Sequence, residues 1–300
     1  MKTFLALFVA LGLPVLAQRP KDTTMWAPKP TKPTAYVAPQ RPHTKLADLL
    51  RNHAGSASWQ ELIVDDDHFR AAYIASAPGA KTERRLHPDT REWWIVMGGQ
   101  IRFSIDGQQP FVASKGTIVQ VPMRTAYSME TVGDAPSLRF EVNIAHAQTL
   151  YPSDVTPPSV AGVDWIQVLL PQKPGVYDRG NKPFVTFESL AAKGGTQRVV
   201  EDDRGVANFI YGYEKDLPPI KTGNRGHYHP ECAEFWLILA GQIRYAIENQ
   251  SVFIADVGDV VYVPKFTFHA PRFYGPGPSC RLAMNGYPEI AHLFDGGARE

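Results

Sequence analysis

Cysteine is nearly absent from this sequence, and its scarcity limits the kinds of protein that the chain can form. Only Cys232 and Cys280 occur in 300 residues. Two cysteines exclude a disulfide-dense scaffold and a zinc site of the CxxC type. In an oxidising compartment the two could form one disulfide, and Cys232 could instead bind a metal as a thiolate. The sequence leaves both alternatives open.

The sequence also lacks an excess of charge and a long apolar run. Lys and Arg number 31 against 30 Asp and Glu, which gives a formal net charge of +1. This balance argues against a nucleic-acid binder that works by charge alone. The partner that we expect is a small-molecule ligand or substrate. The longest apolar run, residues 4–17, contains Pro14 and is shorter than the roughly 20 residues that cross a bilayer. We therefore expect no membrane span in the mature chain.

Residues 1–17 have the features of a secretory signal peptide. Lys2 gives a short positive start, an apolar stretch follows, and the small residue Ala17 precedes Gln18. We predict that this segment is cleaved and that the mature protein is secreted or periplasmic.

Proline, in contrast, is abundant, and the 26 prolines of the chain predict many turns and few long helices. Residues 18–44 are rich in proline and contain few aliphatic side chains. Because such a segment buries little apolar surface, we predict an extended arm that belongs to neither domain and that metal binding does not need. A second proline-rich stretch opens a predicted linker over residues 151–182.

An internal repeat determines the predicted domain organisation. The motif HPDTRE at residues 87–92 matches HPECAE at residues 229–234, and GQIR at residues 99–102 recurs at residues 241–244, in both cases 142 residues later. Further landmarks recur at the same offset: Gly116 with Gly258, Pro122 with Pro264, Arg139 with Arg281, and Asn143 with Asn285. A constant offset predicts two tandem copies of one unit, at residues 45–150 and 183–300.

Each copy has the pattern of β structure. Short apolar runs flank Gly98-Gly99 in the first copy and Ala240-Gly241 in the second, which is a hairpin signal. Another short apolar run lies between a glycine and a proline in each copy. Many short strands with frequent turns predict an all-β sandwich or barrel in each half.

The second copy carries residues with the spacing of a metal site. His227 and His229 are two residues apart, so both imidazoles point to the same face of a strand. Glu234 begins the next apolar strand, and His269 follows a third. If these strands lie side by side, three imidazoles and one carboxylate converge on one divalent transition metal ion (Fe, Mn, Zn, Cu or Ni). Such a set leaves coordination positions free for water, oxygen or substrate.

These residues resemble the two sequence motifs of the cupin superfamily. His227, His229, Glu234 and Gly241 match the first motif, and Gly258, Pro264 and His269 match the second. The resemblance covers both copies and implies a bicupin, that is, two tandem jelly-roll barrels of the double-stranded β-helix type. Two positions depart from the family pattern, because Phe266 and Phe273 stand where the second motif usually has glycine and asparagine.

The first copy has lost part of the ligand set. Arg85, His87, Glu92 and Tyr127 occupy the positions of the four ligands. Since arginine keeps its proton and cannot bind a cation, we predict an empty first site in which Arg85 pairs with Glu92. The first barrel then serves as a packing partner of the second. The alternative role is a pocket for an anionic ligand held by Arg85.

The cupin resemblance implies several activities, and the fold alone does not choose among them. The preferred hypothesis is a metal-dependent oxidoreductase, most plausibly a dioxygenase, acting on a small organic or aromatic substrate bound to the metal. Glu234 is the candidate catalytic residue, because it could also accept a proton, and Trp236 is a candidate wall of the substrate pocket or a core residue. The alternatives are a non-enzymatic ligand-binding cupin and a metal-dependent lyase or isomerase. Oxalate decarboxylation is disfavoured at this stage, because two-domain decarboxylases of the family usually bind metal in both halves. A homo-oligomer is left open.

Overall fold

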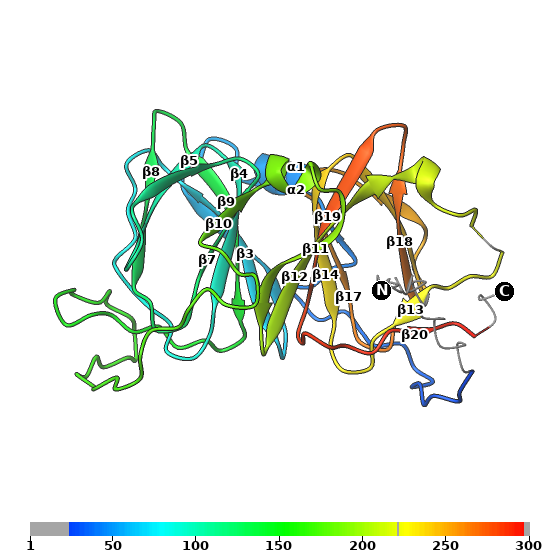
Figure 1. Cartoon of the computed structure of the whole chain (residues 1–300), viewed down its shortest axis with the longest axis horizontal. Coiled ribbons are helices and arrows are strands. Elements are labelled where there is room, and N and C mark those ends of the chain that lie inside the picture. Colours follow the sequence, from blue (N-terminus) through cyan, green and yellow to red (C-terminus); the bar gives the residue numbers. More distant parts are fainter. Residues whose placement is uncertain (1–23, 221, 297–300) are drawn as a thin grey trace, which may run out of the picture.

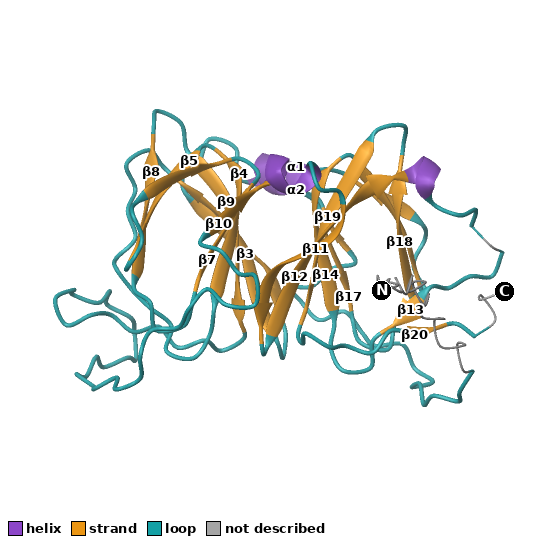
Figure 2. Cartoon of the chain, in the orientation of Figure 1, coloured by secondary structure: helices purple, strands orange, loops and turns teal. Residues whose placement is uncertain are grey.

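The computed structural model describes residues 24–220 and 222–296 and contains two β-barrels side by side (Figure 1). Strands make up nearly all of the regular structure, and the few helices are short (Figure 2). The predicted all-β fold with two tandem barrels is therefore confirmed. The predicted signal peptide, residues 1–17, lies outside the described residues.

From residue 24 on, the first half contains one helix, α1 (Leu46–Asn52), and nine strands. The strands are β1 (His43–Thr44), β2 (Trp59–Asp65), β3 (Phe69–Ser76), β4 (Glu92–Gly98), β5 (Gln100–Ile105), β6 (Phe111–Ser114), β7 (Thr117–Val121), β8 (Tyr127–Val132) and β9 (Ser137–Ile144). A six-stranded sheet of order β10-β7-β4-β9-β3-β2, in which β10 (Phe184–Thr186) comes from the second half, faces a three-stranded sheet of order β6-β5-β8.

The described part of the second half contains helix α2 (Phe187–Ala191), a 3₁₀ turn (Glu214–Asp216) and eleven strands. The strands are β10 (Phe184–Thr186), β11 (Gly195–Asp202), β12 (Gly205–Tyr213), β13 (His227–Tyr228), β14 (Glu234–Ala240), β15 (Gln242–Ile247), β16 (Phe253–Ala255), β17 (Val260–Val263), β18 (His269–Tyr274), β19 (Pro278–Asn285) and β20 (Leu293–Phe294). A six-stranded sheet of order β1-β17-β14-β19-β12-β11 faces a five-stranded sheet of order β16-β15-β18-β13-β20.

The predicted hairpins form around one glycine in each copy. Gly99 lies between β4 and β5 with a φ of 65°, and Gly241 lies between β14 and β15 with a φ of 58°. A Cβ atom at Gly241 would lie 2.4 Å from the carbonyl oxygen of Pro278, and one at Gly99 would lie 2.5 Å from that of Pro136. Only glycine fits a turn with this backbone conformation and this close a neighbour.

The two six-stranded sheets pack against each other and share one apolar core. Phe69 of β3 packs edge-to-face on Phe235 of β14, with ring centroids 5.4 Å apart, and both side chains are fully buried. Strands of this layer are buried on both faces, and β4 accordingly reads as a continuous apolar run instead of alternating. Trp93 belongs to the core between the barrels, whereas Trp94 belongs to the core inside the first barrel. The shared core joins the two halves into one folded body.

Each half contributes a short strand to the sheet of the other half. His43 and Thr44 of β1 pair with β17 in the second barrel, while β10 pairs with β7 in the first barrel. The Nε2 atom of His43 lies 2.7 Å from the carboxylate of Asp259, which holds β1 in place. The structure therefore differs from the expectation of an arm outside both domains: the end of the 18–44 segment completes the sheet that carries Glu234. A two-residue strand has no periodicity that sequence analysis could detect.

Two further expectations concern disulfides and membranes. Cys232 and Cys280 are both buried and both free, so the disulfide alternative is wrong. In the part of the chain that the structure describes, no helix is long and apolar enough to cross a membrane.

Candidate metal centre

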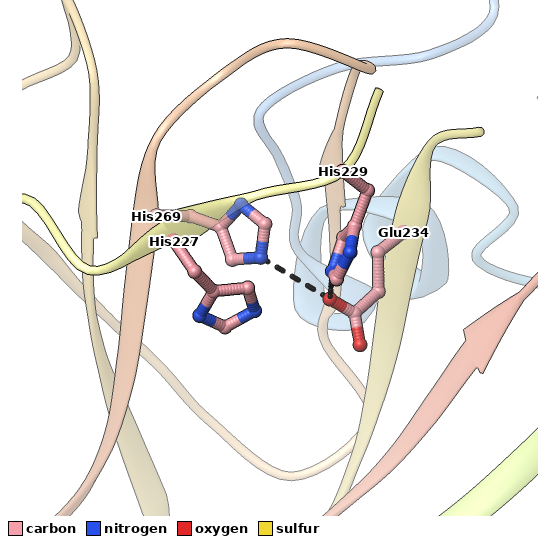
Figure 3. A group of neighbouring side chains, drawn as sticks. All are labelled: His227, His229, Glu234 and His269. Carbon is pink, nitrogen blue, oxygen red and sulfur yellow. Dashed lines mark hydrogen bonds and ion pairs between the residues drawn. The ribbon is translucent and has the colours of Figure 1, made fainter. Parts of the chain in front are cut away.

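Three strands of the second barrel bring the predicted ligands together. β13 supplies His227 and leads to His229, β14 begins at Glu234, and β18 begins at His269. His227 and His269 lie directly opposite each other in the pairing of β13 with β18. The four ligand atoms all lie within 4.8 Å of one another, and their side chains point into one space (Figure 3). The structure thus brings all four predicted ligands into one cluster.

The carboxylate of Glu234 lies at the centre of this cluster. Its Oε2 atom is 3.0 Å from Nε2 of His229 and 3.2 Å from Nε2 of His269 (Figure 3). The ring of His227 completes the group, with its centroid 4.4 Å from that of His269. Three imidazoles and one carboxylate that face one another form the kind of donor set that holds a divalent transition metal.

Backbone carbonyls orient two of the imidazoles. The Nδ1–H of His229 donates to the carbonyl of Ala291 at 2.8 Å, and the Nδ1–H of His269 donates to that of Thr267 at 2.9 Å. With Nδ1 occupied in this way, Nε2 is the atom of each ring that faces the centre. The residues present therefore fit a metal ion.

Burial and mutual charge set the protonation of the cluster. Burial, helped by the charge of His269, lowers the pKa of His227 to about 2, so this imidazole is neutral and able to bind a metal. Burial alone would lower the pKa of His229, but the hydrogen bond and charge of Glu234 outweigh it and raise the pKa. Burial alone would raise the pKa of Glu234, but His229 and His269 hold it well below its usual range. Glu234 therefore stays ionised, which is the form in which a carboxylate binds a metal.

Sequence analysis missed one neighbour of the centre. The ring of His292 lies 4.5 Å from that of His229 and 5.0 Å from that of His227, centroid to centroid. Its Nδ1 atom is hydrogen-bonded to the carbonyl of Ile290 at 3.0 Å. His292 follows β19 in a segment without a repeat counterpart or a motif, so no local signal marks it.

The structure places Cys232 and Trp236, two residues for which sequence analysis left alternative roles. Cys232 lies outside the ligand cluster, and burial raises the pKa of its thiol to about 12, so thiolate ligation is not supported. Trp236 is on the ligand face of β14, with its ring centroid 5.2 Å from that of His269, but it is fully buried and packs on Tyr245. Of the two roles considered for Trp236, the core position is the one observed.

Phe266, which stands where the family motif usually has glycine, adopts the backbone conformation that glycine favours. Its φ is 63°, and its amide donates to the carbonyl of His229 at 2.8 Å. The equivalent residue of the first copy, Arg124, has a φ of 59° and donates to the carbonyl of His87. The loop geometry of the motif is therefore kept in both copies without glycine.

In the first barrel a guanidinium lies near the two ligand residues that remain. Nε of Arg85 donates to the hydroxyl of Tyr127 at 2.8 Å, and its Nη2 lies 3.8 Å from Glu92 and 3.8 Å from Glu141. His87 contacts Glu92 at 2.8 Å, and the hydroxyl of Tyr127 donates to the same carboxylate. The predicted pairing of Arg85 with Glu92 is present, and Glu141 is a second acidic partner that the repeat did not indicate.

This network keeps Glu92 ionised. Burial alone would raise the pKa of Glu92, but His87 and Arg85 lower it to about 2. Burial alone would lower the pKa of Arg85, but Tyr127, Glu92 and Glu141 outweigh it, and the pKa is raised. The guanidinium of Arg85 thus neutralises the carboxylates of Glu92 and Glu141, which would otherwise be available to a metal ion.

A cavity of about 390 Å³ lies beside the centre in the second barrel. His227 forms part of its wall, together with Asn224 and the side chains of Arg244, Arg272 and Arg281. A cavity of this size accommodates a small organic molecule next to a metal ligand.

Comparison with known proteins agrees with these two barrels. A family model described as a cupin domain matches twice, at residues 72–143 and 215–284. The chain belongs to the cupin superfamily. It is a bicupin, with one match in each barrel and the complete ligand set in the second.

Two solved structures and one curated protein are similar to this bicupin. The DEL162-163 mutant of Bacillus subtilis oxalate decarboxylase OxdC has a TM-score of 0.51 at 14% identity and covers 88% of this chain and 81% of that chain. A formate complex of Lactobacillus farciminis oxalate decarboxylase has a TM-score of 0.50 at 13% identity, covering 89% of this chain and 91% of that chain. Oxalate decarboxylase OxdC of Bacillus subtilis (strain 168) is 33% identical over 90 residues, which are 27% of this chain and 23% of that protein. The sequence match therefore spans about a quarter of that relative's length.

Proposed function

We propose that this bicupin is a metal-dependent lyase that removes carbon dioxide from a small carboxylic acid in its C-terminal barrel. The observation that carries the proposal is the convergence of His227, His229, Glu234 and His269 beside a cavity of substrate size. His227 is both a candidate ligand and part of the cavity wall, so the cavity adjoins the centre.

The similar proteins favour a lyase over the oxidoreductase that sequence analysis preferred. Their names describe decarboxylases, and decarboxylation is a lyase reaction. The argument against oxalate decarboxylation was that the first half lacks metal ligands. That argument weakens if one complete centre in the second half suffices for turnover.

Each group of the centre has a chemical task in this proposal. The three histidines and Glu234 would hold a divalent ion, which would supply Lewis-acid chemistry toward a substrate carboxylate. The buried Glu234 stays ionised because of its imidazole neighbours. The carbonyls of Ala291 and Thr267 fix two of the rings.

The reaction balances without an external oxidant. The bond between the carboxylate carbon and its neighbour breaks, carbon dioxide leaves, and the electron pair stays on the neighbouring carbon. That carbon takes up one proton from water. The net change is one carboxylate and one proton converted to one C–H bond and one carbon dioxide.

Simultaneous measurement of carbon dioxide and oxygen tests the proposal. The metal-loaded protein is incubated with small mono- and dicarboxylic acids, including oxalate, and with a phenolic acid. We expect carbon dioxide release without stoichiometric oxygen uptake, and none from the His227→Ala His229→Ala variant. One oxygen consumed per substrate would instead support a dioxygenase, and binding without turnover would support a ligand-binding cupin. Either outcome overturns the lyase proposal. Export remains a prediction from residues 1–17.

A further inference from the structure

The first barrel contains a cavity of about 400 Å³, a volume within the range of about 300–1,000 Å³ that is typical of small-molecule sites. Three of the residues that stand at the metal-ligand positions of this copy, Arg85, His87 and Glu92, line the cavity. Glu141 also lines it and lies opposite Trp94, whose side chain belongs to the core inside this barrel. Because residues directly opposite each other in a sheet point to the same face, the cavity lies on the inner side of the barrel.

The wall of this cavity has hydrogen-bonding atoms that the internal contacts leave free. The hydrogen bonds that the described residues make to the carboxylates of Glu92 and Glu141 all end on Oε2. Both Oε1 atoms lie 3.8 Å from Nη2 of Arg85, which is too far for a hydrogen bond. Of the guanidinium nitrogens, only Nε is hydrogen-bonded within the described part of the chain, to the hydroxyl of Tyr127. Two acceptors and the terminal N–H groups of one donor thus lie next to each other at the cavity.

Two of the charged groups at this cavity have apolar counterparts in the second barrel. Glu141 corresponds to Ala283 at the offset of the repeat. Arg70, which also lines the cavity, lies opposite Asn143, whereas Val206 lies opposite the equivalent asparagine of the second barrel. A barrel that served only as a packing partner would gain stability from apolar residues at these places, because charges that are removed from water are costly. The charged wall therefore indicates a polar ligand.

The arrangement of these charges disfavours an ionic ligand. The guanidinium of Arg85 lies between the carboxylates of Glu92 and Glu141, and at the exposed rim Arg70 lies opposite Asp65. An anion that approached Arg85 would meet two carboxylate oxygens at the same place, and a cation would meet the guanidinium. A hydroxyl group is compatible with both neighbours, because it donates to a carboxylate and accepts from a guanidinium.

We propose that the first barrel is a metal-free binding site for a small, neutral, polyhydroxylated molecule, namely a monosaccharide or a sugar alcohol. Its hydroxyl groups accept from the terminal N–H groups of Arg85 and donate to Oε1 of Glu92 and Glu141. Hydrogen bonds in which one partner is charged are stronger than those between neutral groups. Gln60 and Asn143 add uncharged donors and acceptors to the same wall. This site goes beyond the proposed lyase activity, since it lies in the other barrel.

Binding to the full-length protein tests the class of ligand. Calorimetric titrations are made with glucose, galactose, xylose and mannitol as neutral compounds, and with acetate and phosphate as anions. We expect at least one neutral compound to bind at one site per chain, with an affinity that does not change as salt is added, since the compound carries no charge. The absence of binding by all four neutral compounds would overturn the inference, and so would tighter binding of acetate or phosphate than of every neutral compound.

Variants with a matched control locate the site. Glu141→Gln should weaken binding of the tightest neutral compound at least tenfold, whereas Glu130→Gln should leave it unchanged, because Glu130 pairs with Arg102 on the outer face of the same barrel. Ala72→Leu fills the cavity without removing a charge and should weaken binding as much, which keeps the test valid if Glu141→Gln does not fold. The metal content of the second barrel reports whether each variant is folded. Unchanged binding in a folded Glu141→Gln or Ala72→Leu variant, or equal loss in Glu130→Gln, would refute the assignment.

This proposal and the lyase proposal fail in different ways. The His227→Ala His229→Ala variant should lose carbon dioxide release but bind the same neutral compound with unchanged affinity, since the first barrel has an incomplete set of metal ligands. Loss of that binding in the variant would place the ligand in the second barrel and refute the inference. Binding of a neutral compound without carbon dioxide release from any acid would refute the lyase and leave the site in the first barrel standing.

Discussion

The stabilising role of the Arg85 guanidinium in the first barrel can be tested by restoring the two lost metal ligands. Arg85→His with Tyr127→His would give the first copy the four residue types of the second. In the present protein Arg85 lies between Glu92 and Glu141, and the Glu92 side chain is only 4% exposed. The double variant removes the guanidinium and leaves these carboxylates without their cation. We therefore expect it to be less stable than the parent when no metal is present.

The size of this loss in stability can be estimated from the contacts of Arg85 with Glu92 and Glu141. Removing one partner of a fully buried ion pair costs about 3–5 kcal/mol. The Arg85 side chain is 22% exposed and its Nη2 is 3.8 Å from each carboxylate, so solvent screening reduces this cost. A loss of about 2 kcal/mol remains as a lower bound, since shortening the buried Tyr127 adds to it. At about 2–4 °C for each kcal/mol in a domain of this size, the melting temperature should fall by about 4–8 °C.

Thermal melting of parent and variant, each with chelator and with excess Zn²⁺ or Mn²⁺, measures this effect. A metal at about 100 times its dissociation constant stabilises the native state by about 2.7 kcal/mol, which is enough to offset the loss. Arg102→His is the matched control, because the Arg102 side chain is 46% exposed and such surface pairs contribute about 1 kcal/mol or less. Equal melting temperatures of parent and double variant under chelation would falsify the account of a buried pair. A destabilised variant that added metal does not rescue would show that the four positions do not converge as they do in the second barrel.

Three further predictions concern the metal ion and strand β1, which pairs with β17 of the second barrel. Elemental analysis should find one transition metal per chain, which the His227→Ala His229→Ala variant loses; two metals per chain would contradict the assignment of the first barrel. Metal content should fall when the protein is dialysed at pH 4, because protons compete with the metal for Nε2 of His229, whose pKa is raised, while His227, with a pKa of about 2, stays neutral; retention of the full content at pH 4 would contradict ligation by His229. Deletion of residues 1–44 should lower the melting temperature and the metal content, since β1 is then missing from the sheet that carries Glu234, whereas deletion of residues 1–23 should do neither; equal behaviour of the two deletions would show that β1 is not needed.

The sequence by itself determined the duplication, the β class and the ligand set. These depend on regularities that are local or that recur at a fixed offset. Alternation along a strand places His227 and His229 on one face, and the 142-residue offset aligns every landmark of the two copies. The same alignment showed that the first copy keeps only His87 and Glu92, and it correctly paired Arg85 with Glu92.

Tertiary structure decided which distant groups meet. The exchange of β1 and β10 between the sheets depends on the packing of the two barrels, because strands of two or three residues carry no pattern of their own. His292 reaches the metal cluster from a segment that has no motif. Sequence spacing fixes which face of a strand a side chain occupies, but the closure of the barrel fixes its neighbours, because those neighbours come from strands that are far apart along the chain.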